Sequence, residues 1–203
     1  AVIGLGGIGA QTARIAKGMG MKVIAYNRTK RSETPIQLVD LDELLVASDV
    51  VSINLVLNDE TRNFLNAERI ARLKPGAILV NTARGALVDE DAMLDALRSG
   101  QIRHAGLDVF HHEPLAPDDP ILTLPNIICS PHNAGQTPEV VRDGLLRAVA
   151  NVEHFLAGNP TDVVVAPVGG DLAEPALRSL RWAGRFVTVG YASGTIPRIP
   201  LNL

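Results

Sequence analysis

Three glycines near the start of the chain constrain its fold more than any other feature. Gly4, Gly6 and Gly9 form the pattern G-x-G-x-x-G directly after a short apolar run, 1–3. An amphipathic segment follows, and residues 22–26 (KVIAY) then indicate a second strand. Strand, glycine turn, helix and strand in this order predict a dinucleotide site, where glycines permit a tight turn, the approach of a pyrophosphate and close helix packing. A turn without a ligand would explain one glycine but not three at this spacing.

The composition of the chain excludes several classes of protein and partner. A length of 203 residues suits one domain or one domain plus a fragment, and 46% hydrophobic with 20% charged residues is typical of a soluble globular protein. The formal net charge of −3 argues against a nucleic-acid partner, and no apolar run reaches the ~18 residues of a membrane span. Cys129 is the single cysteine, which excludes an intramolecular disulfide and favours a cytoplasmic location. The chain opens without Met and inside an expected strand, which indicates that it is cut from a longer protein.

Apolar segments typical of buried strands alternate with amphipathic segments. Further strands are expected at 50–55, 77–81, 105–109 and 127–129, and helices at 10–19, 41–48, 66–73, 89–99 and 137–157. Gly100 should end the fourth of these helices. This alternation predicts a doubly wound parallel sheet, an α/β fold of the Rossmann type. Ligands bind such sheets at the carboxyl ends of the strands.

The second expected strand is followed by a basic segment, which consists of Asn27, Arg28, Thr29, Lys30 and Arg31. In this fold an acidic residue at that position usually binds the 2′-hydroxyl of the adenosine ribose, whereas Arg accommodates a 2′-phosphate. Here the acid is missing, and a guanidinium at Arg28 can bind a phosphate in a fork. The sequence therefore predicts NADP(H) in preference to NAD(H). A solvated basic loop is the alternative, but it does not explain the missing acid.

Residues that suit carbonyl chemistry follow three later strands. A nicotinamide enzyme acting on a carbonyl needs a proton donor, and His132 suits this role because histidine titrates near neutral pH. The carboxylate of Glu113 would favour the protonated ring, and Arg84 would bind a substrate carboxylate through two parallel hydrogen bonds. Taken singly, each of these residues, like Asp108, could be an exposed turn or capping residue. Because all of them lie just past the end of a strand, we expect their side chains to converge on one crevice.

The other histidines and the cysteine suggest no second site. His111 and His112 are adjacent, so their side chains would point apart on a strand, and no third ligand lies at a metal-site spacing. We therefore expect structural or solvent-facing histidines and no metal. Cys129 lies in an apolar strand without a charged neighbour in sequence, so we expect a core residue and not a nucleophile.

Seven short motifs occur together in the order of a known family. They are 4–9 (GLGGIG), 74–77 (KPGA), 80–85 (VNTARG), 88–90 (VDE), 106–110 (GLDVF), 113–114 (EP) and 130–132 (SPH). This combination resembles the nucleotide-binding domain of the D-isomer-specific 2-hydroxyacid dehydrogenases over residues 1–158. The sequence at 27–29 is most similar to the NADPH-using glyoxylate/hydroxypyruvate reductase branch.

The resemblance implies roles for matching residues. Arg84 would bind the carboxylate and carbonyl of a 2-oxo acid, and His132, paired with Glu113, would be the general acid in reduction. Asp108 would hold the nicotinamide carboxamide. The backbone of residues 7–8 would contact the pyrophosphate. Asn27 and Arg28 would contact the adenosine ribose and its 2′-phosphate. The full set of implied cofactor contacts is Gly4, Gly6, Gly7, Ile8, Gly9, Asn27, Arg28, Thr29, Val56, Thr82, Ala83, Asp108 and Gly135.

The chain departs from the family in two places. Family members often carry Pro at the position of Val56, which should affect the adenosine side only modestly. The family also has a second domain, built largely from sequence before the glycine motif, and this chain has none of that sequence. Because that domain contacts the substrate and closes the cleft, substrate orientation and water exclusion should both suffer.

The tail, 159–203, is expected to form an appended β-α-β unit. We expect a strand at 162–165, a helix from Asp171 to Gly184 with Glu174 in a capping arrangement, and a strand at 185–190. This tail resembles a late piece of a zinc-independent quinone oxidoreductase of the medium-chain dehydrogenase superfamily, so the chain resembles a chimera of two Rossmann-type proteins. The two strands should extend the main sheet or pair with another copy of the chain.

The leading expectation for function is NADP(H)-dependent reduction of glyoxylate, hydroxypyruvate or a similar 2-oxo acid, by a homodimer. The alternative is a cofactor-binding module without turnover, since the substrate domain is missing. Quinone reduction is a weaker third hypothesis, because the tail carries only a late fragment of that fold.

Overall fold

The computed structural model of the chain describes residues 1–29, 35–159, 161–166 and 180–188. They belong to two compact units, Ala1–Ala134 and Gly135–Leu203. The domain boundary after residue 158, which rests on the family resemblance, stays a prediction. No helix in the described ranges is long and apolar enough to cross a membrane.

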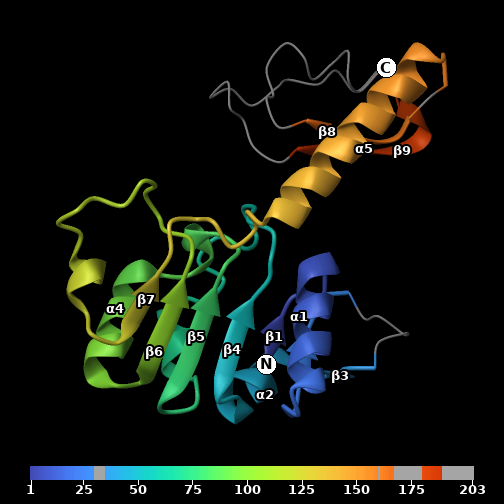
Figure 1. The fold of residues 1–203 in the computed structure, drawn as a ribbon. Coiled ribbons are helices and arrows are strands. Elements are labelled where there is room, and N and C mark those ends of the chain that lie inside the picture. The colour runs from blue at the N-terminus through green and yellow to red at the C-terminus, as the bar shows by residue number, and fades with distance from the viewer. Residues whose placement is uncertain (30–34, 160, 167–179, 189–203) are drawn as a thin grey trace. The chain divides into compact units, whose positions relative to one another are not determined.

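The first unit is built on a sheet of seven parallel strands (Figure 1). The strands are β1 (Val2–Ile3), β2 (Ile24–Tyr26), β3 (Gln37–Leu38), β4 (Val50–Ile53), β5 (Ala77–Asn81), β6 (Ile102–Leu107) and β7 (Ile127–Cys129). Their order is β3-β2-β1-β4-β5-β6-β7. The predicted doubly wound parallel sheet is confirmed. The strand order reverses its direction between β1 and β4, which are neighbours in the sheet.

Helices connect the strands of this unit. They are α1 (Gly7–Gly18), α2 (Leu41–Ala47), α3 (Ala67–Ala71) and α4 (Glu90–Ser99), with short 3-10 turns η1 (Gly85–Leu87) and η2 (Pro120–Thr123). The start and end of α4 follow the prediction, because the side chain of Asp89 accepts a hydrogen bond from the N–H of Ala92, and Gly100, with φ of 82°, ends the helix. In contrast, α1 begins at Gly7 and not at residue 10, because the glycine turn passes directly into helical backbone.

Two apolar clusters lie on opposite faces of this sheet. Successive side chains of a strand point to opposite faces, and Val2 and Ile3 of β1 belong to different clusters. The larger cluster contains Ile3 and buried residues of α2, α3 and α4, whereas Val2 packs with Ala13 of α1 and with Ala25. Because helices cover both faces, a ligand can reach the sheet only at its edges.

The second unit contains α5 (Pro138–Leu156), β8 (Thr161–Ala166) and β9 (Leu180–Thr188). Here two expectations are corrected. β8 and β9 pair with each other in a parallel two-stranded sheet and do not extend the main sheet, whereas their pairing with another copy of the chain stays a prediction. The expected helix cannot reach Gly184, because β9 begins at Leu180; pairing with β8 gives this backbone its hydrogen-bond partners and overrides a weak local helix signal. The rest of that helix, 171–179, lies outside the described residues.

Candidate functional site

The residues singled out from the sequence lie where strands of the first unit end. The positions that directly follow or closely follow a strand are Gly4 (β1), Asn27 (β2), Val56 (β4), Arg84 (β5), Asp108 (β6) and His132 (β7). Because all seven strands are parallel, these positions share the carboxyl edge of the sheet, where doubly wound sheets bind their ligands. Gly135 stands apart, since it belongs to the second unit.

The glycine turn between β1 and α1 is tightly packed. Gly4 has a φ of +93°, and a Cβ there would lie 2.5 Å from the carbonyl oxygen of Asn54. A Cβ on Gly9 would lie 1.9 Å from the carbonyl oxygen of Gly4, so the first turn of α1 packs directly on the strand end. At Gly6 a Cβ would meet nothing within 4 Å, which leaves this backbone open to a ligand. The three glycines thus provide the turn, the packing and the open approach that a pyrophosphate site requires.

The N-terminus of α1 is suited to an anion. Gly6 is the N-cap, no side chain caps the helix, and its first turn holds no acidic residue. The first N–H groups of a helix lack partners within it, and the helix dipole adds partial positive charge there. The residues around Gly7 and the exposed Ile8 therefore fit the pyrophosphate of a dinucleotide.

A cleft open to solvent, with about 900 Å³ of empty space, lies beside the glycine turn. Its lining residues come from the turn, from the end of β2 and from the loop after β4: Gly4, Gly6, Tyr26, Asn27, Arg28, Thr29, Asn54, Leu55, Val56, Asn58, Glu60, Thr61 and Phe64. The predicted adenosine contacts Asn27, Arg28, Thr29 and Val56 thus line one cleft.

The side chain of Asn27 forms hydrogen bonds with two backbone segments that line this cleft. Its Oδ1 accepts a hydrogen bond of 2.9 Å from the N–H of Leu5, and its Nδ2 donates one of 2.6 Å to the carbonyl of Thr29. The side chain therefore ties the glycine turn to the end of β2.

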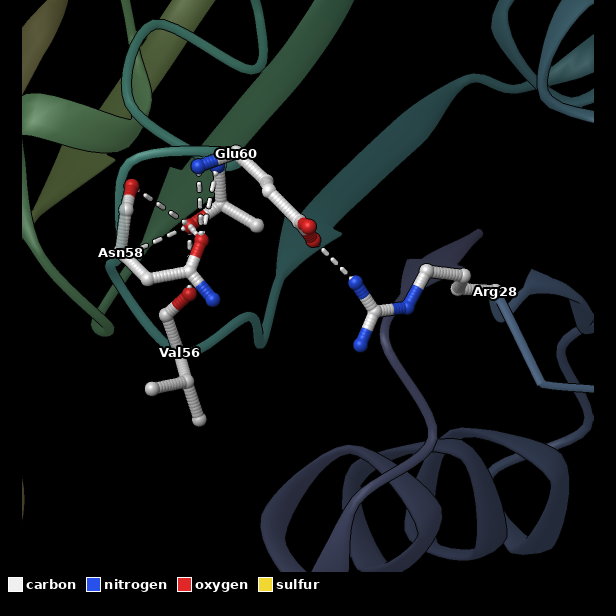
Figure 2. Close-up of polar contacts among 5 residues, drawn as sticks. Arg28, Val56, Asn58 and Glu60 are labelled. Atoms are coloured by element: carbon white, nitrogen blue, oxygen red, sulfur yellow. Dashed lines mark hydrogen bonds and ion pairs between the residues drawn. The ribbon is translucent and has the colours of Figure 1, made fainter.

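Arg28 is paired with a carboxylate from another part of the chain. Its Nη1 donates to Oε2 of Glu60, in the loop after β4 (Figure 2). The two side chains are 76% and 71% exposed. The guanidinium predicted for a 2′-phosphate is thus already engaged with an anion, although water reaches both partners.

His132 and Glu113 form a hydrogen-bonded pair at the other end of the edge. Nδ1 of His132 lies 2.6 Å from Oε2 of Glu113, and the N–H of Phe110 donates to the second carboxylate oxygen at 2.8 Å. His132 has a φ of +53°, a backbone conformation that is uncommon outside glycine and is concentrated at functional sites. The carboxylate fixes the ring orientation, and Nε2 is the ring nitrogen left for a substrate.

The environment of Glu113 keeps its carboxylate ionised. Partial burial acts to raise the pKa of Glu113, but hydrogen bonds from His132 and from the Phe110 N–H act in the opposite direction. The charges of His132 and Arg84 add to them, and the net result is a pKa below the ordinary value. An ionised Glu113 is the state that supports a protonated imidazole.

Asp108 organises the turn that carries His132. It is 3% exposed. Its Oδ1 accepts from the hydroxyl of Ser130 at 2.6 Å and from the N–H of Asn133 at 2.9 Å, and its Oδ2 accepts from the N–H of Ala134 at 2.9 Å. Burial alone would raise the pKa of Asp108, yet these hydrogen bonds and the charge of His132 lower it overall. Because Oδ2 accepts a single one of these bonds, it retains an acceptor position for a ligand amide.

Arg84 is positioned through Asn81, the last residue of β5. The Asn81 side chain is almost fully buried; it donates to the carbonyl of Arg84 at 2.9 Å and accepts from the N–H of Ala83 at 3.1 Å. The guanidinium of Arg84 is exposed and donates to the Ala83 carbonyl at 2.6 Å. Thr82 is also exposed. The backbone here is fixed while the guanidinium faces solvent.

Three residues of the site were missed in the sequence analysis, namely Glu60, Asn81 and Ser130. A signal existed for two of them, because polar residues that end or follow an apolar strand, such as Asn81 and Ser130, lie at the ligand-binding edge. Glu60 lies seven positions after Ile53, the last residue of β4, and nothing local marks it. Its role depends on β4 being next to β1 in the sheet.

The histidines and the cysteine outside this edge are accounted for among the described residues. Nε2 of His111 lies 2.8 Å from the carbonyl oxygen of Val88. Among the residues that the structure describes, no group of three His, Cys, Asp or Glu could hold a metal ion. Partial burial, followed by the charge of Asp119, raises the pKa of the half-buried Cys129 thiol, which disfavours the thiolate.

Comparison with known proteins agrees with this geometry. The sequence profile of "D-isomer specific 2-hydroxyacid dehydrogenase, NAD binding domain" matches residues 1–134. The chain belongs to the D-isomer specific 2-hydroxyacid dehydrogenase family. The matched residues are the first compact unit, so this unit is the nicotinamide-cofactor domain of the family.

Individual relatives extend this result. A glyoxylate reductase from Korarchaeum cryptofilum is 44% identical over 142 residues, which are 68% of this chain and 43% of that protein. A family member from Xanthobacter autotrophicus, solved with NADPH and MES, superimposes with a TM-score of 0.71 at 37% identity, over 79% of this chain and 67% of the other. A D-lactate dehydrogenase with NAD+ from Lactobacillus jensenii gives a TM-score of 0.73 at 32% identity, over 78% and 52%.

The chain spans about half the length of the curated relatives it matches. The solved structures include complexes with both forms of the cofactor. The family is thereby established, whereas the choice between NAD(H) and NADP(H) depends on the residues of this chain. The resemblance of the tail to a quinone oxidoreductase, and with it the chimera, stays a prediction.

Proposed function

We propose that the chain carries the cofactor site and the acid–base residues of a reductase for a small 2-oxo acid such as glyoxylate or hydroxypyruvate. The observation that carries this proposal is the hydrogen bond of 2.6 Å between His132 and Glu113, at the edge where the glycine turn also lies. Relatives that match the chain are named glyoxylate reductase and hydroxypyruvate reductase, which supports this substrate class.

In this proposal His132 is the general acid. Glu113 accepts a hydrogen bond from Nδ1–H and stabilises the imidazolium, so Nε2–H can donate its proton to the carbonyl oxygen of the substrate. Asp108 is a positioning residue for this step, because it holds the turn 130–134. Proton transfer to the oxygen accompanies delivery of a hydride to the carbonyl carbon, which is the chemistry that a bound nicotinamide supplies.

Arg84 orients the substrate. Its guanidinium offers paired N–H donors in a plane that matches a carboxylate, and its exposed position lets the substrate reach it. Asn81 fixes the backbone from which the side chain extends. A 2-oxo acid bound through its carboxylate would place its carbonyl at a defined distance from His132.

We propose that the cofactor is NADP(H) in preference to NAD(H), with Asn27, Arg28 and Thr29 at the adenosine ribose. The cleft fits a dinucleotide, since the uncapped start of α1 can accept its pyrophosphate and the end of β2 lines the same cleft. Val56, Thr82 and Ala83 complete the proposed contacts of the first unit, and a contact by Gly135, which belongs to the second unit, stays a prediction. The absence of an acid after β2 supports the phosphorylated form.

A homodimer in the cytoplasm is part of the same proposal. Large apolar side chains are exposed along α5, at Val140, Val141, Leu145, Leu146, Val149 and Val152. Exposed apolar side chains on one helix are typical of surfaces that pack against another chain.

One titration tests the function. NADPH is added to the purified protein while its fluorescence is followed, with NADH as the comparison, and glyoxylate or hydroxypyruvate is then added to the same cuvette. We expect saturable NADPH binding, tighter than NADH binding, followed by loss of the reduced-nicotinamide absorbance. Binding without turnover would contradict the reductase and leave the cofactor-binding module. Absence of binding by either cofactor would contradict both.

A further inference from the structure

The end of the cleft proposed for the adenosine is lined by an acidic residue, Glu60, as well as by the basic residue Arg28. The sequence lacks an acidic residue directly after β2, where this fold usually has one. The structure brings a carboxylate to that place from elsewhere, because Glu60 pairs with Arg28 across the gap between the two loops (Figure 2). Both residues line the same cleft.

The backbone of Glu60 is held in position. The Glu60 N–H and the Thr61 N–H each donate to Oδ1 of Asn58 at 3.0 Å. The hydroxyl of Thr61 donates to the carbonyl of Val56 at 2.6 Å and accepts from the N–H of Asn58 at 2.8 Å. These bonds fix the loop 56–61, whereas the carboxylate of Glu60 is anchored by Arg28 alone among the contacts of the described residues. The side chain can therefore turn away from Arg28 without moving its loop.

NAD(H) and NADP(H) would interact differently with the Arg28–Glu60 pair. The ribose 2′-hydroxyl of NAD(H) is a donor and an acceptor, so a carboxylate can accept from it while remaining near Arg28. The 2′-phosphate of NADP(H) is an anion that Arg28 can bind, but the neighbouring carboxylate repels it. The phosphate would therefore share the guanidinium with Glu60 at an electrostatic cost or displace it.

We propose that Glu60 determines the balance between the two cofactors, by serving as the acid that the end of β2 lacks and by competing with a 2′-phosphate for Arg28. This inference rests on the cofactor site proposed above and adds a specificity residue to it. The preference for NADP(H) created by the missing acid is reduced by Glu60, so the wild-type chain accepts both cofactors.

The variant that tests this is Glu60→Gln, which removes the charge and keeps the size and an acceptor. Asp59→Asn is the matched control, because it removes the same charge from the adjacent residue, which does not line the cleft. Dissociation constants for NADPH and NADH are measured by fluorescence titration, and those for 2′,5′-ADP and 5′-AMP by calorimetry. The two nucleotides probe the adenosine end without the nicotinamide.

Glu60→Gln should raise the ratio of the NADH to the NADPH dissociation constant about three- to fivefold, chiefly through tighter NADPH binding, and should favour 2′,5′-ADP over 5′-AMP to a similar degree. Asp59→Asn should change either ratio less than about twofold. Equal ratios for Glu60→Gln and the control would overturn the inference while leaving the cofactor site intact. If wild-type protein binds neither cofactor, the proposed function itself is wrong. Unchanged thermal unfolding of both variants verifies that they are folded.

Discussion

Asp108, after β6, and Arg28, after β2, both carry a charge at the carboxyl edge of one sheet, but the two charges are held in different ways. Asp108 is 3% exposed and accepts hydrogen bonds from Ser130, Asn133 and Ala134. Arg28 and its partner Glu60 have side chains that are 76% and 71% exposed. A buried carboxylate with fixed donors maintains a geometry, whereas an exposed ion pair is weak and can exchange partners. The end of the edge that carries Asp108 and His132 is thus preorganised, and the end that carries Arg28 and Glu60 is adjustable.

The largest expected effect tests the preorganised end. Asp108→Ala removes the acceptor of three donors and should lower the free energy of unfolding by about 2–3 kcal/mol. Asp108→Asn keeps one acceptor oxygen but turns an amide toward an N–H donor, so it should cost about half as much. Urea unfolding followed by circular dichroism measures both values. A loss below about 0.5 kcal/mol for Asp108→Ala would show that the turn 130–134 holds its shape without this carboxylate.

Part of the acid dependence of stability comes from the same residue. The pKa of Asp108 is lower in the folded protein than its ordinary value of 3.8. The folded state therefore binds fewer protons than the unfolded state as the pH falls toward the folded pKa. The contribution to stability is present above the ordinary value and is lost below it. Asp108→Asn should show a shallower loss of stability than wild type between neutral pH and about pH 3. Parallel curves would contradict this assignment.

A smaller effect tests the coupling between Glu113 and His132. Replacing His132 with Phe removes a hydrogen bond and a charge that lower the pKa of Glu113, so that pKa should rise toward or above its ordinary value. His132→Gln, which can still donate a hydrogen bond, should give a smaller rise. Carbon-13 NMR of the carboxyl group against pH measures both. His104→Phe, at an exposed position of β6, serves as the control and should leave Glu113 unchanged.

The smallest effect is expected at the adjustable end. Arg28→Ala, Glu60→Ala and the double variant should each change the free energy of unfolding by less than about 0.5 kcal/mol, because water already surrounds the pair. The double-mutant cycle should give a coupling energy in the same range. Chemical unfolding of the four proteins provides the measurement. A coupling above about 1 kcal/mol would remove the contrast between the two ends and argue against exchange of Arg28 between Glu60 and a phosphate.

Much of the fold followed from local patterns in the sequence. The glycine turn, the alternation of strands and helices and the end of α4 were expected from residues such as Gly4 and Gly100, because these features depend on neighbours within a few positions. The secondary structure of the tail was predicted less accurately. A capping pattern near Asp171 suggested a helix through Gly184, but strand pairing between β8 and β9 prevailed there.

The sequence by itself determined which residues follow strand ends, and therefore that Arg84, Asp108 and His132 share an edge of a parallel sheet. Only the tertiary structure decided how they are held. Asp108 meets the backbone of 133–134, and Glu60 meets Arg28, through contacts between segments more than 20 positions apart in the chain. Strand order and loop conformation create these contacts, and neither is encoded in the spacing of apolar and polar residues. The physical reason is that periodicity fixes local backbone, whereas the partner of a polar side chain depends on which strands become neighbours.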